Sequence, residues 1–245
     1  MTPVSQLQNV KTLRHSAVVR ITHWLTFVAF MALLITGGEI VISHPRFYWG
    51  EVGNVNTQPL FVIPIPSSRG TVPTSYNYVM PDQNGWSRYL HFEAAWVAVL
   101  TGLVYAIYGI ATGHFRRNIL PDRHDWNLHA YRERIARYLH RTPANRGEEK
   151  SYNVLQRGAY LVVIVILFPL IIWTGLAMSP SFTAAFPWTA ALLGGRQSAR
   201  TIHFFVSWLL LFFLIVHVTM VAVSGFWPRL RAMITGYIRE SEEAP

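Results

Sequence analysis

Four of the ten histidines in this 245-residue chain lie inside strongly hydrophobic segments, at His23, His91, His203 and His217. A histidine in such surroundings is costly in free energy and indicates a function by default. Its ring nitrogens bind metals and serve as axial ligands of haem iron. One such residue could simply hydrogen-bond to a neighbouring helix, but four with regular spacing predict a redox or metal centre.

The spacing of these histidines predicts two pairs. His203 and His217 are 14 residues apart, so they face the same way on a helix and lie about 21 Å apart along it. If successive hydrophobic segments cross a membrane in alternating directions, His23 shares the depth of His217, and His91 shares the depth of His203. We therefore predict two bis-histidine haem b sites, one near each membrane surface, with these four residues as iron ligands.

Three of the histidines are each preceded, three residues earlier, by an arginine: Arg20, Arg88 and Arg200. Residues i and i+3 share a helix face, so each arginine lies one turn closer to water on the predicted haem side. A haem propionate would emerge there and accept hydrogen bonds from a guanidinium group. The alternative is that these arginines snorkel at the membrane edge, which explains their position but not the repeated spacing.

Two glycines are expected on the haem-facing sides of their helices. Gly37 lies 14 residues after His23, and Gly102 lies 11 residues after His91. A glycine lets a flat macrocycle approach the backbone, because it has no side chain. Membrane helices also use glycine to pack against each other, and the sequence leaves that alternative open.

Four hydrophobic stretches must position these residues, near Val18–Ile42, Tyr89–Gly113, Leu155–Met178 and Thr201–Phe226. Each is long enough to cross a hydrocarbon core, which takes about 20 apolar residues. The composition agrees, because 51% of the residues are hydrophobic and only 13% are charged. We expect an all-α fold, an integral membrane four-helix bundle, with residues 1–245 forming a single di-haem domain.

The distribution of positive charge predicts the orientation of this bundle. Four crossings place both termini and the middle loop on one side, and that side carries sixteen of the 21 Lys and Arg residues. The positive-inside rule therefore predicts that both termini are cytoplasmic, in a multi-pass protein of the bacterial inner membrane. The basic excess is expected to meet anionic membrane lipid rather than nucleic acid.

The loops carry three weaker signals. Residues 43–87 form a long outer loop, rich in Pro, Gly and aromatic residues, that is predicted to dock a partner or simply to cap the helix ends. Asp125–His140 has an amphipathic helical period that is typical of a helix on the inner leaflet. Phe182–Gly195 is expected to contain a short outer helix.

Other site chemistry is excluded or weakly indicated. The chain has no cysteine, which excludes disulfides, iron–sulfur ligation, thiol catalysis and covalent haem attachment. No local histidine cluster of zinc-enzyme type occurs. Glu93 lies within the second hydrophobic stretch, where it could carry protons or simply turn outward. The remaining histidines are expected to be interfacial or solvated, and these are His15, His44, His114, His124, His129 and His140.

The chain resembles the di-haem cytochrome b membrane subunits of formate dehydrogenases, nickel–iron hydrogenases and thiosulfate-reductase-type molybdoenzymes. The resemblance covers all four helices and is carried by Arg20-x-x-His23-Trp24, by His91-Phe92, by the spacing of His203 and His217, and by Tyr152-Asn153-x-x-Gln156-Arg157. It implies the ligand pairing given above. It also implies a quinone site near the inner haem with Asn153 and Gln156 as polar contacts, although Asn153 could instead cap a helix. The long outer loop is more similar to the thiosulfate-reductase branch.

These features predict an electron-transfer subunit without a catalytic residue of its own. Two haem b groups would pass electrons between quinone, as substrate, and a periplasmic oxidoreductase partner of molybdoenzyme type. A stand-alone di-haem quinone oxidoreductase that reacts with a small outer species such as superoxide is the alternative. A haem-free transporter is disfavoured, because no inverted repeat or discontinuous helix is visible. The sequence leaves open a homo-oligomer and the direction of electron flow.

Overall fold

The computed structural model describes residues 11–54, 56–64, 83–120, 132, 136, 154–223 and 225–239. Four helical segments in this part of the chain are long and apolar enough to cross a membrane. They are α1 (Ala17–Ser43), α2 (Gln83–Ala111), a third span made of α4 (Val154–Leu161), η4 (Val162–Leu167) and α5 (Phe168–Met178), and α8 (Arg196–Val223). The predicted all-α membrane bundle is thereby confirmed, although α2 and α8 begin earlier than expected, at Gln83 and Arg196.

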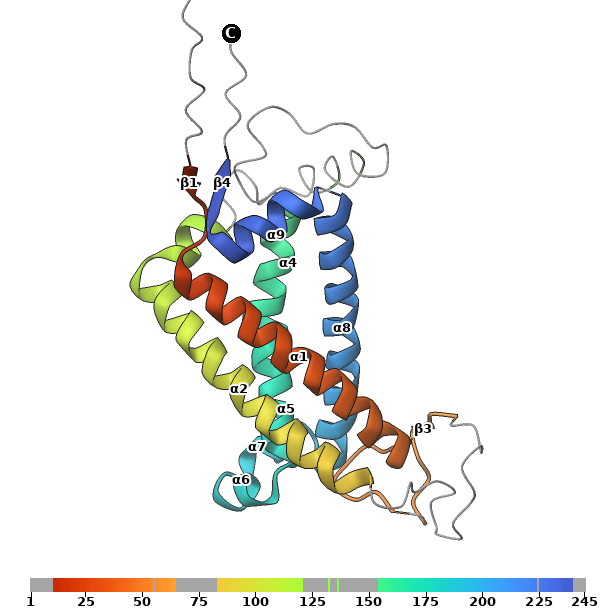
Figure 1. Cartoon of the computed structure of the whole chain (residues 1–245). Coiled ribbons are helices and arrows are strands. Elements are labelled where there is room, and N and C mark those ends of the chain that lie inside the picture. The colour runs from red at the N-terminus through yellow and green to blue at the C-terminus, as the bar shows by residue number, and fades with distance from the viewer. Residues whose placement is uncertain are drawn as a thin grey trace, which may run out of the picture.

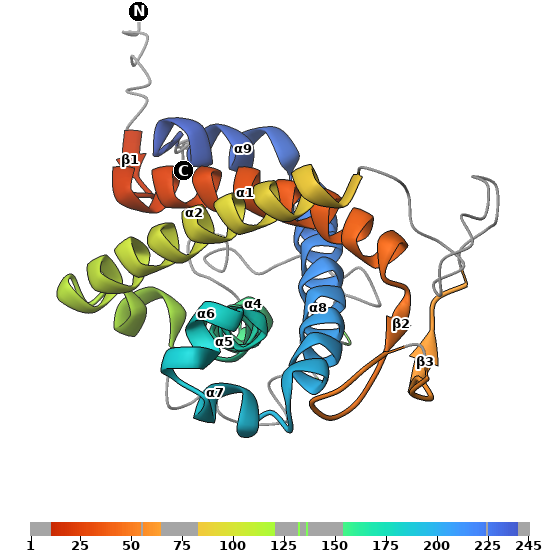
Figure 2. The ribbon, with the colours of Figure 1, turned by 90° about the horizontal axis from the view of Figure 1, so that it is seen from below.

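The four spans form two helix pairs. Helix α1 packs along α2, and α5 packs along α8. The two pairs cross obliquely, since α4 and α5 are seen almost end on in Figure 2 while α1 and α2 run across the view (Figures 1 and 2). Large apolar side chains such as Leu100, Ile107 and Phe212 are exposed, which suits a surface that faces lipid.

The third span contains a wide π-helical turn, η4, directly before α5. Pro169 stands in the first turn of α5. Proline has no N–H to donate, and its ring would clash with the carbonyl of the residue four positions earlier in a regular α-helix. The wider turn before it lets the helix continue without that clash, so the span reaches Thr174 and Gly175 with helical geometry.

One end of the bundle gathers the segments next to both termini. Strand β1 (Lys11–Leu13) pairs antiparallel with β4 (Tyr237–Arg239). Helix α9 (Phe226–Thr235) lies next to them and is fastened to α1, since Trp24 Nε1 donates to the Met233 carbonyl at 3.2 Å and Arg20 donates to the Ile234 carbonyl. We call this the inner end. That it faces the cytoplasm stays a prediction.

The opposite, outer end is built from the connections after α1 and α5. Strands β2 (Arg46–Phe47) and β3 (Phe61–Val62) form a small hairpin in which the rings of Phe47 and Phe61 stack at 4.8 Å. Two short helices, α6 (Pro180–Ala185) and α7 (Trp188–Ala191), stand in the region where one outer helix was predicted.

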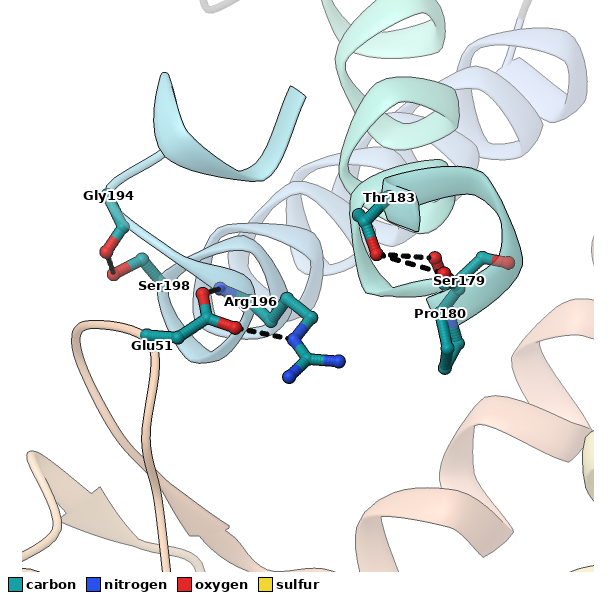
Figure 3. A network of polar contacts seen from close by, with 7 residues as sticks. All are labelled: Glu51, Ser179, Pro180, Thr183, Gly194, Arg196 and Ser198. Atoms are coloured by element: carbon teal, nitrogen blue, oxygen red, sulfur yellow. Dashed lines mark hydrogen bonds and ion pairs between the residues drawn. The ribbon is translucent and has the colours of Figure 1, made fainter. Parts of the chain in front are cut away.

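Polar contacts hold the outer loop to the start of α8 (Figure 3). The Glu51 carboxylate accepts hydrogen bonds from the Arg196 side chain and from its backbone N–H. Ser198 Oγ accepts from the Gly50 N–H at 2.7 Å and donates to the Gly194 carbonyl. Part of the predicted docking loop is therefore anchored to the helix that carries two of the four histidines.

On the inner side, η1 (Phe115–Ile119) follows α2. The predicted interfacial segment Asp125–His140 lies outside the described residues, apart from residues 132 and 136.

Candidate functional site

The fold brings the four membrane histidines together in two pairs. The ring centroids of His23 in α1 and His217 in α8 are 6.4 Å apart, with the ring planes at 53°. The centroids of His91 in α2 and His203 in α8 are 6.3 Å apart, with the planes at 60°. These are the pairs expected from membrane depth, and α8 contributes one histidine to each.

The two separations fit a metal ion between each pair of rings. An imidazole nitrogen lies about 2.0 Å from a first-row metal, so two rings on opposite sides of one ion have centroids roughly 6 Å apart. Among the described residues no group of three or more His, Cys, Asp or Glu could hold a metal ion alone. A pair of histidines without further protein ligands suits haem, whose porphyrin supplies the four remaining nitrogen ligands.

Two threonines support the outer pair. Thr36 Oγ1 in α1 lies 2.9 Å from His91 Nδ1, and Thr174 Oγ1 in α5 lies 2.9 Å from His203 Nδ1. Both threonines are fully buried. Neither was singled out from the sequence, because a threonine inside a helix usually just bonds back to its own turn.

Glycines follow both threonines. A Cβ on Gly37 would lie 3.6 Å from His91 Cε1, and a Cβ on Gly175 would lie 3.6 Å from His203 Cε1. Gly37 was predicted to lie at the outer site, and the structure places it there, whereas Gly175 was missed. A Cβ on Gly102 would meet no atom within 4 Å, so this glycine stands next to open space.

Aromatic rings pack against the inner pair. The ring of Trp24 meets His23 edge-on, with the ring centroids 5.2 Å apart, and Phe213 stacks on His217, with the centroids 5.8 Å apart. Tyr160 of α4 also contacts His217, at 6.4 Å. The buried Nδ1 of His23 has no hydrogen-bond partner among the residues that the structure describes.

The predicted propionate arginines lie at the ends of the helices. Arg200 donates to the backbone carbonyls of Arg46 and His44, and its guanidinium lies 4.8 Å from the centre of the Phe47 ring. Arg20 bonds to the Ile234 carbonyl, but its Nε is buried without a partner in the described part of the chain. Arg88 is exposed. An unsatisfied buried donor at the inner site suits an acidic group of a cofactor, and the propionate role of the three arginines stays a prediction.

Three histidines outside the spans are partly buried rather than solvated. Burial, with the nearby charge of Arg14 as the next largest cause, lowers the pKa of His15 to about 4. Burial and then the charge of Arg200 lower the pKa of His44. Burial and Arg117 lower the pKa of His114. In each case the lowered pKa favours the neutral ring.

The residues suggested for quinone lie at the edge of the described structure. Asn153 is outside the described residues, and so are His124, His129 and His140. Gln156 belongs to the first turns of α4, but its side chain is not among those described. Glu93 is exposed on α2, and its proton role is an open prediction.

Comparisons with known proteins identify a family and relatives of this chain. The family model for prokaryotic cytochrome b561 matches residues 14–236. A putative protein-methionine-sulfoxide reductase subunit of Azospira oryzae is 30% identical over 232 residues, which cover 91% of this chain and 96% of the relative. A probable nickel–iron hydrogenase B-type cytochrome subunit of Cupriavidus necator is 24% identical over 235 residues, which cover 91% of this chain and 85% of the relative.

Proposed function

Because this chain belongs to the prokaryotic cytochrome b561 family, whose model matches residues 14–236, we propose that it carries electrons across the membrane through two b haems, between quinone and a periplasmic oxidoreductase partner. The chain is a multi-pass membrane cytochrome b of the electron-transfer subunit type. The number of haems, the quinone and the side of the partner are proposed here.

One observation carries the proposal, namely two histidine pairs at opposite ends of the same helix. His217 and His23 would hold the inner haem, and His203 and His91 would hold the outer one. A bound b haem supplies reversible one-electron redox chemistry at its iron. Helix α8 fixes the distance between the sites, because His203 and His217 are separated by about 21 Å of helical rise.

The protein residues around each pair hold the rings and exclude water. At the outer site these residues are Thr36, Gly37, Thr174 and Gly175, and at the inner site they are Trp24, Phe213 and Tyr160. Gly37 and Gly102 are proposed to let the flat cofactor approach α1 and α2 closely. We place quinone at the inner end, with Asn153 and Gln156 as its polar contacts, and propionates next to Arg20, Arg88 and Arg200.

The relatives support a catalytic partner and a direction of flow. Both are named as subunits, one of a putative reductase and one of a hydrogenase. A reductase partner would draw electrons from quinol outward, and a hydrogenase partner would deliver them inward. The reductase subunit has the higher identity and coverage, so we propose outward flow from quinol to a partner docked on the outer end.

The test begins with the full chain purified in detergent from its native membrane. We expect two non-covalent b haems per chain, both reduced by added quinol, and a second polypeptide that co-purifies. His114→Ala is the matched control and should keep both haems, because His114 contacts Tyr105, Tyr108 and Phe115 rather than a membrane histidine. One haem or none would overturn the pairing. Two haems without any co-purifying partner would favour the stand-alone oxidoreductase.

A further inference from the structure

The same dipeptide stands next to both histidines of the outer pair. Thr36-Gly37 belongs to α1, and Thr174-Gly175 belongs to α5. Each lies on the helix that packs against the helix of its histidine, since α1 packs along α2 and α5 along α8. Each helix pair thus places a Thr-Gly dipeptide next to one outer histidine, although the two dipeptides lie far apart in the sequence.

The two supports have the same geometry. Both threonine hydroxyl oxygens lie 2.9 Å from the Nδ1 atom of the facing histidine. In both cases a Cβ on the following glycine would lie 3.6 Å from the Cε1 atom of the same ring. The hydroxyl thus meets one edge of the imidazole, while the bare glycine backbone leaves room for the neighbouring ring carbon.

Counting donors and acceptors decides the direction of these hydrogen bonds. Thr36 Oγ1 lies 2.7 Å from the Ala32 carbonyl, and Thr174 Oγ1 lies 2.8 Å from the Leu170 carbonyl. A hydroxyl has a single proton, and a carbonyl can only accept, so that proton goes to the helix backbone. The hydroxyl oxygen must then accept the Nδ1–H of the histidine. This leaves Nε2 without a proton, which is the form that binds a metal.

We propose that Thr36 and Thr174 are the positioning residues of the outer site, which hold both of its histidines in the metal-binding tautomer and lower the midpoint potential of the haem bound there. The proposal rests on the proposed two-haem function. Its physical basis is that a histidine whose second nitrogen donates to an acceptor becomes a more basic ligand. A more basic ligand stabilises the oxidised, more positive iron and therefore lowers the potential.

At the inner site, at least one of the two histidines lacks a hydrogen bond of this kind. His23 Nδ1 has no partner among the described residues, and the neighbours of its ring include Trp24, which is an edge-on aromatic contact. Removal of the threonine hydroxyls should therefore move one haem and leave the other unchanged. This selectivity distinguishes a positioning role from a general loss of stability.

The experiment is a redox titration of the full chain, purified in detergent, with each haem followed by its optical spectrum. The component that is absent from His203→Ala is the outer haem. We expect Thr36→Val and Thr174→Val each to raise its midpoint potential, and the double variant to raise it further, with the inner haem unmoved. Thr36→Ser and Thr174→Ser keep the oxygen and should restore the wild-type potential. Thr101→Val removes a buried threonine hydroxyl of α2 and should leave the outer potential unchanged.

Unchanged outer potentials in both valine variants would overturn the inference. Complete loss of the outer haem in the valine variants supports it only if the serine variants keep the haem, and loss in both sets overturns it. Fewer than two haems in the wild-type protein would instead overturn the proposed function, and this inference with it. Two haems with unmoved potentials leave the function standing and remove only the role of the threonines.

Discussion

The outer and inner histidine pairs have almost the same separation but very different surroundings. The ring centroids are 6.3 Å apart at the outer pair and 6.4 Å apart at the inner pair. Hydroxyl groups of fully buried threonines contact the outer rings, whereas aromatic rings of Trp24, Phe213 and Tyr160 pack against the inner ones. The two sites therefore share the spacing of their histidines but differ in the groups that contact the histidine rings.

In the proposed function, with the partner at the outer end and quinone at the inner end, this difference suits different tasks for the two sites. Hydrogen bonds fix the orientation of a ring, because they weaken steeply away from their preferred geometry. Aromatic packing buries area but tolerates several ring arrangements. A site that exchanges single electrons with a docked protein benefits from fixed ligands. A site next to quinone must accommodate a substrate that arrives, reacts and leaves.

The largest effect should come from the removal of one ligand from each pair. His203→Ala should abolish the outer haem and keep the inner one, still reducible by quinol. His217→Ala should abolish the inner haem and, with it, reduction by quinol. The reason is that a bis-histidine site loses one of two axial bonds, while the other site lies about 21 Å away along α8. Haem content and reduced-minus-oxidised spectra measure both outcomes.

Partner variants sharpen this result. His91→Ala should reproduce the spectrum of His203→Ala, and His23→Ala should reproduce that of His217→Ala. If His23→Ala removed the same spectral component as His203→Ala, the assignment of ligands to the two ends would be wrong.

A large but more selective effect is expected from a side chain added next to an outer ligand. Gly37→Leu should lower the occupancy of the outer haem, since its Cβ would already lie in van der Waals contact with His91 Cε1, at 3.6 Å, and the rest of the side chain would compete with the ring for space. Gly38→Leu is the matched control, because a Cβ there would meet no atom within 4 Å. The measurement is haem content per chain. Equal haem loss in both variants would show that Gly37 has no special place at the outer site.

The sequence was sufficient to predict the spans and the depth-matched pairs. Length, apolar content and the spacing of His203 and His217 are local properties that a membrane converts directly into depth. Helix ends were predicted less well, because α8 continues outward to Arg196, where the outer loop supplies the Glu51 carboxylate. No helical period reveals such a contact.

The threonine supports could not be predicted, because they depend on which helix packs against which. Thr36 lies 55 residues from His91 in the sequence, and Thr174 lies 29 residues from His203. Only the pairing of α1 with α2 and of α5 with α8 brings them together. A signal was nevertheless present, since Thr-Gly recurs in three of the four hydrophobic stretches. It is not specific, because Thr101-Gly102 has the same sequence but, in the described part of the chain, Thr36 and Thr174 are the threonines that contact His91 and His203.

A moderate effect is expected at the inner end from Trp24→Phe. The change keeps a ring next to His23 but removes the donor that bonds to the Met233 carbonyl at 3.2 Å. Loss of one such hydrogen bond costs about 1 kcal/mol, and it should loosen α9 in particular. Faster amide hydrogen exchange in α9 would be the measured result. Trp208→Phe is the control. It should leave exchange in α9 unchanged, because the Trp208 ring is exposed on the apolar surface of α8.

The smallest effect concerns the link between the outer loop and α8. Glu51 bonds to both the side chain and the backbone N–H of Arg196. The side chain of Glu51 is nevertheless 52% exposed, and that of Arg196 is 46% exposed. Exposed ion pairs contribute roughly 0.2–1 kcal/mol, so Glu51→Gln should lower the apparent melting temperature only slightly at pH 7. The double variant with Arg196→Gln measures the coupling between the two side chains, because a shared interaction makes the two single effects non-additive.

The pH dependence of this small effect identifies its cause. The backbone N–H of Arg196, followed by its side chain, holds the pKa of Glu51 below the usual value of 4.5. A carboxyl group with a lowered pKa in the folded state adds stability above the unfolded-state pKa, and loses it as the pH falls through the folded-state value. The difference in melting temperature between wild type and Glu51→Gln should therefore be present at pH 7 and disappear in strongly acidic buffer. A difference that persisted in acid would mean that the size of the Glu51 side chain, rather than its charge, holds this part of the loop against α8.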